Sequence, residues 1–242
     1  MLRDDHLLQA MHAAGVHRRN VVYVSVPITS GEREIALLDE TGLRSSLELR
    51  TTKPDTWRER VLEPNSQDAD RRATAVRSAA WIPHDFVVVD PSRITVQGWE
   101  QDDYNRFWVR LMEEHVRYLV STPGWQFSRG ARTEVGYALT FSDATLEIVD
   151  VTGTPLSPTG IRASAEEARR GLMQRGWLQE EIDAYLPPLR EERPDLSPSA
   201  QSQAFGWLIA ERRFQVRHYG PEQDDRHLVD GGLRPEGWWS KQ

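Results

Sequence analysis

A short run of β-branched and aromatic residues, VVYVSV at 21–26, constrains the fold most, because Pro27 and the turn Thr29-Ser30-Gly31 follow it directly. An apolar run of this length between turn residues is typical of a strand that is buried on both faces of a parallel sheet. Three further runs repeat the pattern more or less strongly and stop near a proline or glycine: 86–89 (FVVV), 118–120 (YLV) and 146–149 (LEIV). The sequence therefore predicts four buried strands.

Helical periodicity lies between these strands. From Asp102 onward the apolar residues recur with the spacing of one helix face, and a second helix is expected over 131–139 after the turn Ser128-Arg129-Gly130. Strands that alternate with helices predict a flavodoxin-like, doubly wound parallel α/β sheet. In such sheets the ligand binds beyond the carboxyl ends of the strands, where 27–31, 90–95 and 125–130 should meet.

The remaining segments are expected to surround a core that spans 21–151. Residues 1–20 are predicted to form a helical extension, and 38–80 a charged insertion that is helical from 68 to 80. Residues 159–242 are predicted to form a C-terminal helical addition. Within it, a capping box at 164–167 should open a helix that runs to Gly176, and further helices are expected over 179–186 and 200–216.

Composition excludes several kinds of site. The 242 residues carry a net charge of -7, which gives no reason to expect nucleic acid or an anionic membrane as a partner. The absence of cysteine excludes disulfides and thiolate chemistry, and the seven histidines are scattered, so we expect neither a metal nor a cofactor. An acidic cluster around Asp224 and His227 is interpreted as a solvated turn. The start of the chain lacks a signal-peptide run and no stretch is long enough to span a bilayer, so a soluble cytoplasmic protein is expected.

The segment TPGWQFSRGARTEVGYA, at 122–138, carries the most chemical information. A strand end leads into a glycine-containing loop and then into a helix whose first turns bear Glu134. Backbone N–H groups at such a helix start can hold an anion. By position alone, a glutamate there more often balances the helix dipole than attacks a substrate.

This segment resembles the signature of the nucleoside 2-deoxyribosyltransferase-like superfamily, in the form PGW-x-x-S-x-GA-x-x-E. Its matching residues are Pro123, Gly124, Trp125, Ser128, Gly130, Ala131 and Glu134. The first strand also resembles that of the superfamily. Tyr23 takes the place of the family's active-site tyrosine, and the strand-end loop that follows looks like the family's loop. The resemblance covers roughly residues 21–150.

The resemblance implies roles for these residues. Glu134 would be the nucleophile beneath the anomeric carbon, and Tyr23 would orient it unless it is only a core aromatic. Ser128 stands where the family's transferases tend to have an aspartate and its monophosphate hydrolases a serine, which favours a 5'-phosphate, although a serine there also caps a helix. Gly130 and the loop residues Thr29 and Ser30 would line the substrate site.

The proton donor for the leaving base is less well marked. Asp102 and Asp103 are the best candidates and Asp90 follows, although all three residue positions also suit helix caps or turns. The family often has an aspartate just before the third strand, where this chain has Arg117 and Tyr118. Trp125 is the favoured residue for stacking on a base.

These features predict an N-glycosidase that acts on a nucleoside 5'-monophosphate. A nucleoside deoxyribosyltransferase, an NAD-cleaving enzyme and a non-catalytic nucleotide sensor are the alternatives. The expected partner is a small nucleoside or nucleotide, and the resemblance also implies a homo-oligomer. Arg129 and Arg132 add positive charge near the site, but exposed helix arginines are common.

Overall fold

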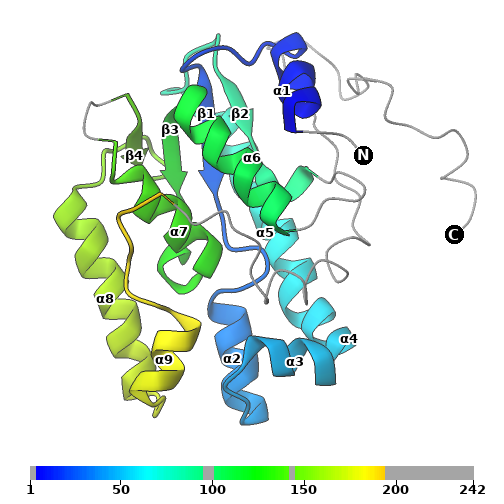
Figure 1. Ribbon diagram of the computed structural model, residues 1–242, viewed down its shortest axis with the longest axis vertical. Coiled ribbons are helices and arrows are strands. Elements are labelled where there is room, and N and C mark those ends of the chain that lie inside the picture. Colours follow the sequence, from blue (N-terminus) through cyan, green and yellow to red (C-terminus); the bar gives the residue numbers. More distant parts are fainter. Residues whose placement is uncertain (1–3, 95–100, 142–144, 194–242) are drawn as a thin grey trace, which may run out of the picture.

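The computed structural model describes residues 4–94, 101–141 and 145–193, and for 4–6, 101–103 and 105 it describes the backbone alone. Its centre is a four-stranded, all-parallel sheet in the order β2-β1-β3-β4 (Figure 1). The strands are β1 (Val21–Ser25), β2 (Val87–Val89), β3 (Val116–Ser121) and β4 (Glu147–Val149). All four coincide with the predicted runs to within two residues, and helices flank the sheet, so the predicted flavodoxin-like α/β fold is confirmed.

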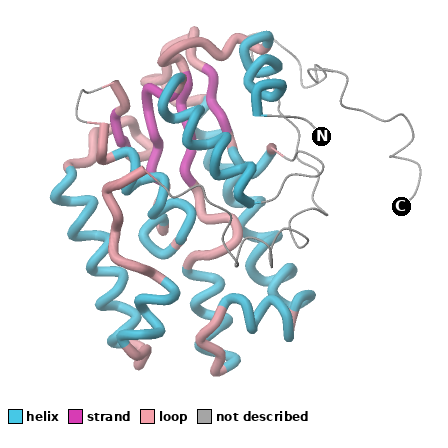
Figure 2. Tube along the Cα trace, viewed as in Figure 1, coloured by secondary structure: helices cyan, strands magenta, loops and turns pink. Residues whose placement is uncertain are grey.

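Helices make every connection between the strands (Figure 2). Between β1 and β2 lie α2 (Glu32–Thr41), α3 (Ser46–Thr52), α4 (Pro54–Trp57), a π-helical turn (Arg58–Leu62) and α5 (Glu63–Arg77). Helix α6 (Gln101–Glu114) joins β2 to β3, and α7 (Arg129–Ala138) joins β3 to β4. Helix α1 (Asp4–Ala13) precedes the sheet, while α8 (Pro158–Gln174) and α9 (Gln179–Tyr185) follow it.

Successive residues of β1 face opposite layers, as the pleat of a strand requires. Val22 and Val24 pack against α5, whereas Tyr23 packs in the main core with residues of α6 and α7. In Figure 1, α6 and α7 accordingly lie in front of the sheet and α5 lies behind it. The connections that leave β1 and β3 thus run to opposite faces, and the carboxyl ends of these two strands form the crevice where such sheets usually bind ligands.

Two sequence-based expectations about helices need correction. The segment 38–80 is helical over most of its length, not only from 68 onward, and helix begins as early as Glu32. Helix α8 does not open at Ser164. It begins at Pro158, and the N-cap is Ser157, whose hydroxyl accepts a bond from the Gly160 N–H. Proline at the first helical position favours this earlier start.

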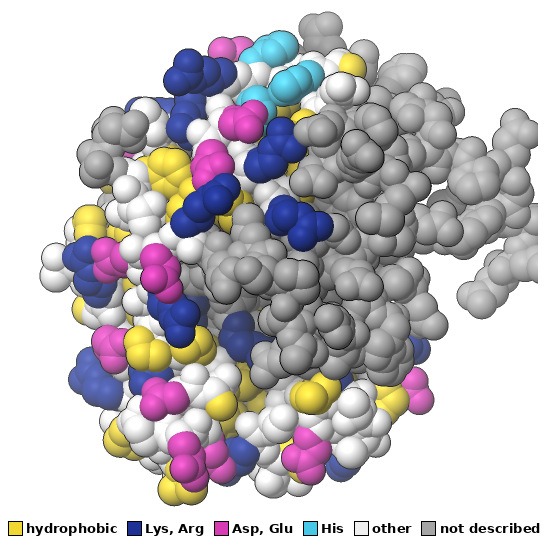
Figure 3. All heavy atoms as spheres, viewed as in Figure 1, with side chains coloured by type: hydrophobic (Ala, Val, Ile, Leu, Met, Phe, Trp, Pro, Cys, Tyr) yellow, Lys and Arg dark blue, Asp and Glu magenta, His cyan; other side chains and the backbone are white. Residues whose placement is uncertain are grey.

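The two helices after β4 pack closely on the rest of the molecule. Ile161 and Ala165 of α8 belong to the main core, and Trp177 and Tyr185 share a second apolar cluster with α2. The predicted helix over 200–216 lies outside the described residues. No helix within the described ranges is both long and apolar enough to cross a membrane. Basic and acidic side chains are interspersed on the described part of the face in Figure 3.

Candidate active site

The carboxylate of Glu134 is held by two hydroxyls from one strand. Tyr23 Oη donates to Glu134 Oε1 at 2.6 Å, and Ser25 Oγ donates to Glu134 Oε2 at 2.6 Å. Tyr23 and Ser25 are two residues apart on β1, so both side chains point to the face that α7 covers. Each carboxylate oxygen therefore has its own donor at the carboxyl end of the sheet.

The surroundings of Glu134 act on its ionisation in two directions. Burial raises the pKa of Glu134 to about 7, while the bonds from Ser25 and Tyr23 favour the charged form and oppose that rise. Burial and the neighbouring carboxylate keep the pKa of Tyr23 well above its usual value, so its hydroxyl stays protonated as a donor. The Tyr23 ring packs against Trp108, with 5.4 Å between ring centroids.

Two buried serines meet at the start of α7. Ser128 is the N-cap, and its hydroxyl accepts a bond from the Ala131 N–H at 3.4 Å. The Ser30 hydroxyl lies 3.2 Å from that of Ser128 and also accepts the Arg129 N–H at 3.3 Å. The structure thus joins the loop after β1 to the helix that carries Glu134, as the sequence predicted for these two segments.

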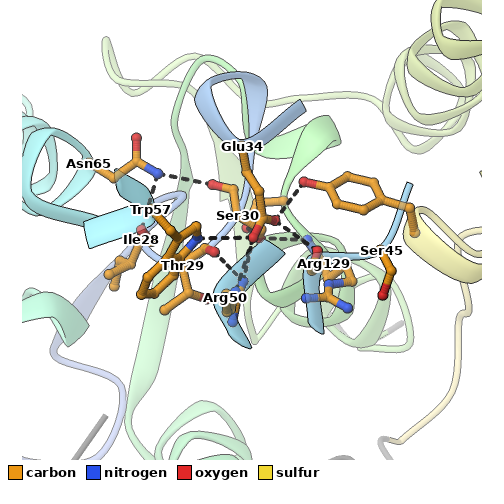
Figure 4. Close-up of polar contacts among 12 residues, drawn as sticks. Ile28, Thr29, Ser30, Glu34, Ser45, Arg50, Trp57, Asn65 and Arg129 are labelled. Carbon is orange, nitrogen blue, oxygen red and sulfur yellow. Dashed lines mark hydrogen bonds and ion pairs between the residues drawn. The ribbon is translucent and has the colours of Figure 1, made fainter. Parts of the chain in front are cut away.

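A polar network fixes the loop that contains Thr29 and Ser30. Asn65 of α5 donates to the carbonyls of Ile28 and Ser30, both at 3.1 Å, and Arg50 of α3 donates to the carbonyl of Thr29 (Figure 4). The side chain of Thr29 makes none of these contacts. The loop is therefore held through its backbone.

Arg50 is itself anchored by Glu34, which is completely buried in α2. Four side chains donate to this carboxylate: Ser46, Arg50, Trp57 and Tyr185, with shortest distances of 3.1, 2.8, 3.1 and 2.8 Å. Because Tyr185 belongs to α9, the helices after β4 help to support the loop at the carboxyl edge. This network could not be predicted from the sequence, since a glutamate and an arginine are seldom expected in a core.

The two arginines of α7 have different surroundings. Arg132 is buried and donates to the carbonyls of Gln126, Ala165 and Pro187. It therefore links α7 to these three segments and is not a surface charge. The guanidinium of Arg129 lies 5.6 Å from the centroid of the Tyr185 ring, and within the described residues no side chain or carbonyl accepts a hydrogen bond from it. Burial lowers the pKa of Arg129 below its ordinary value.

Of the three predicted acids, the structure describes the side chain of Asp90 but not those of Asp102 and Asp103. Asp102 and Asp103 lie in the first turn of α6, but their side chains are outside the described residues. Asp90 is described: one of its oxygens accepts from Ser92 N–H at 2.9 Å and from Ser92 Oγ at 2.6 Å, which caps a short 3₁₀ turn. Burial raises the pKa of Asp90, and its side chain is only 1% exposed. A substrate has little access to this carboxyl, so the structure favours the capping role.

Two other predicted site residues differ in exposure. Trp125 is 6% exposed and packs in the main core, as Trp108 does, which leaves little of its ring open for the expected stacking on a base. Gly130 is exposed on the first turn of α7, and an added Cβ there would meet no protein atom within 4 Å. The protein's own packing therefore does not require glycine at this position.

A cavity of about 230 Å³ opens on the other face of the sheet edge. It lies between the segments that follow β1 and β3, at Val26-Pro27 and Pro123-Gly124, and α5 closes one side through Asn65 and Arg72. Neither Tyr23, Ser25 nor Glu134 lines it, so it is distinct from the carboxylate site.

Sequence reasoning missed Ser25, although its position offered a signal. A serine two residues after Tyr23, in an otherwise apolar run, presents a hydroxyl on the same face as the tyrosine.

Among the described residues, no group of three or more histidines, aspartates or glutamates is arranged to hold a metal ion. Comparisons of the chain with protein-family models, with curated proteins and with solved structures find no match.

Proposed function

We propose that this protein hydrolyses the N-glycosidic bond of a nucleoside 5'-monophosphate through a covalent glycosyl-Glu134 intermediate. The observation that carries the proposal is the carboxylate of Glu134, which receives one hydroxyl on each oxygen at the carboxyl edge of a parallel sheet. Such an arrangement orients a carboxylate as retaining glycosidases require. The motif around Glu134 supports the same conclusion.

The reaction has two steps in this proposal. An oxygen of Glu134 attacks C1' of the sugar while the C1'–N bond breaks and the departing base takes a proton from an acid, for which Asp103 or Asp102 is the candidate. Water then attacks C1', the ester to Glu134 breaks, and the proton of water returns to that acid group. The products are the free base and the sugar 5-phosphate.

Substrate choice rests on the start of α7. The hydroxyls of Ser30 and Ser128 lie together there at the N-terminus of a ten-residue helix. Arg129 adds a cationic side chain to the same turn, and its guanidinium lies near the Tyr185 ring. Hydroxyl and N–H donors with a positive charge suit a phosphate dianion. These groups support a monophosphate as the substrate. The two buried hydroxyls now bond each other and accept the Arg129 and Ala131 N–H groups, so a phosphate would take over donors that these contacts already use.

The test is incubation of the full chain with a panel of nucleosides and their 5'-monophosphates, followed by chromatography for free base. We expect base release from at least one monophosphate, and a loss of at least about a thousandfold in Glu134→Gln, because the covalent step is removed. Glu166→Gln, which changes an exposed carboxylate on α8, is the matched control and should keep wild-type turnover. Wild-type rates in Glu134→Gln would exclude the proposed nucleophile, and base exchange without hydrolysis would instead favour the transferase.

A further inference from the structure

We propose that Ser25 is a positioning residue, which fixes the plane of the Glu134 carboxylate and favours the charged form that attacks the substrate. The hydrogen bond from Ser25 Oγ to Glu134 Oε2 is 2.6 Å long and joins residues 109 positions apart. The role of Ser25 in turnover rests on the proposed function. Its effect on the ionisation of Glu134 does not, and can be measured separately.

The backbone holds Ser25 at a defined place. It is the last residue of β1, pairs with Ser121 of β3, and its carbonyl accepts two bonds from Thr122, from Oγ1 at 2.9 Å and from the N–H at 3.3 Å. The χ1 torsion then places Oγ, and rotation about Cβ–Oγ aims its hydrogen. A donor placed in this way needs little ordering when it binds a carboxylate, and so it can define the orientation of that group.

Ser121 shows that a serine at this level of the sheet does not acquire a partner automatically. It lies beside Ser25 in the register of β1 and β3, on the same face of the sheet, and is also buried. Its hydroxyl has no hydrogen-bond partner in the described structure. The bond from Ser25 to Glu134 is therefore a specific contact, and Ser121 provides a control position with the same residue type, strand end and burial.

Few ionisable groups face Glu134 within the described residues. Tyr23 donates to it from β1, and Asp90 at the end of β2 acts electrostatically on Tyr23. From β3 the facing residue is Ser121, which does not titrate, and Arg132 on the same helix is bound to three carbonyls. Burial raises the pKa of Glu134, and the Ser25 hydroxyl is the first of the two groups that oppose this rise.

The direct test is a pH titration of the glutamate side-chain carboxyls by carbon-13 NMR, on the full chain. Loss of a hydrogen bond to a charged group should raise the pKa of Glu134 by about one unit in Ser25→Ala. Ser25→Thr keeps a hydroxyl on a strand-favouring side chain and should restore the wild-type value, and Ser121→Ala should leave it unchanged. If the alanine variant does not fold, Ser25→Cys replaces it, because a thiol is a weak donor and should shift the pKa in the same direction.

The second readout is the pH profile of kcat/KM for base release, whose acid limb should move upward by the same amount in Ser25→Ala. An unchanged Glu134 pKa in a folded Ser25→Ala, or an equal rise in Ser121→Ala, would overturn the inference. If the pKa of Glu134 rises in Ser25→Ala but the wild-type protein releases no base from any substrate, the proposed function is wrong. The effect of Ser25 on the ionisation of Glu134 is then still supported.

Discussion

The hydroxyls of Ser30 and Ser128 lie 3.2 Å apart, although 98 residues separate them in the chain. One follows the first strand and the other caps the helix of the candidate nucleophile, and both are buried. This contact is the point at which the two halves of the candidate site meet. Under the proposed function, the 5' end of the substrate is expected to bind beside this contact.

We therefore expect the wild-type protein to prefer a nucleoside 5'-monophosphate over the matching nucleoside by at least about tenfold in kcat/KM, since each charge-assisted bond contributes about 1.5–3 kcal/mol. Ser128→Asp should invert this preference, because a carboxylate repels phosphate and accepts a bond from a free 5'-hydroxyl. Aspartate is as good an N-cap as serine, so α7 should persist. Ser157→Asp, at the exposed N-cap of α8, is the control. Equal kcat/KM for nucleoside and monophosphate in wild type would remove the phosphate assignment.

The first turn of α6 should supply the acid. A helix that follows a strand of a parallel sheet begins at the carboxyl edge, where Glu134 also lies. Asp103→Asn and Asp102→Asn, made separately, should slow release most for bases that are poor leaving groups, because a more basic nitrogen depends more on protonation. Single-turnover rates across a series of bases measure this. A small and uniform effect for both variants would reduce both residues to helix caps.

Glu134→Gln should change the pH dependence of stability. The folded protein raises the pKa of Glu134 from 4.5 to about 7, so between these pH values the unfolded chain has lost a proton that the native state still holds. Glu134 therefore weakens the native state progressively as pH rises from 4.5 to 7, by at most about 3 kcal/mol above pH 7. Glu134→Gln removes this loss, and should gain stability relative to wild type between pH 5 and pH 8.

Urea unfolding at several pH values gives the comparison. Glu59→Gln, at an exposed position between α4 and α5, should track wild type at every pH. A constant difference in unfolding free energy between wild type and Glu134→Gln would show that Glu134 titrates alike in the folded and unfolded chain, contrary to this expectation.

Two glycines in helices should respond oppositely to alanine. A Cβ at Gly136 of α7 would lie 2.3 Å from the Arg190 carbonyl oxygen, whereas one at Gly171 of α8 would meet nothing within 4 Å. Gly136→Ala should therefore displace the segment after α9 and destabilise the protein by more than about 1 kcal/mol. Gly171→Ala should stabilise it by up to about 1 kcal/mol, since alanine favours helix. Thermal unfolding of both variants measures these changes in stability. A change in the same direction for Gly136→Ala and Gly171→Ala would contradict the prediction.

The sheet and its order of elements were predictable because β-branched runs are rare outside buried strands. The helices between β1 and β2 were not, because their core positions include charged residues. Glu34 and Arg50 are buried as a hydrogen-bonded pair, so the apolar stripe that normally reveals a helix face is interrupted in α2 and α3. A sequence pattern shows residue types, and the pairing that makes a buried charge acceptable appears only in three dimensions.

The candidate site was predictable in part for a similar reason. The motif indicated Glu134 and Tyr23, which the structure brings together, whereas Ser25 became visible only through its contact across 109 residues. Trp125 was expected to stack on a base because it lies in the strand-end loop. That loop folds back into a 3₁₀ turn and places the ring in the core, a choice of direction that local sequence does not encode.

Strand β1 is hydrogen-bonded along both edges, to β2 and to β3, while Glu134 reaches it from a helix through side-chain contacts alone. Amides of such a central strand open last in native-state hydrogen exchange, and helices at the periphery open earlier. By this rule the two hydroxyl donors should belong to the most persistent part of the molecule, and the carboxylate that they orient to a part that opens earlier. Heat or denaturant should dismantle the candidate site while the sheet still stands, so the temperature range in which the protein works should be narrower than the range in which it is folded.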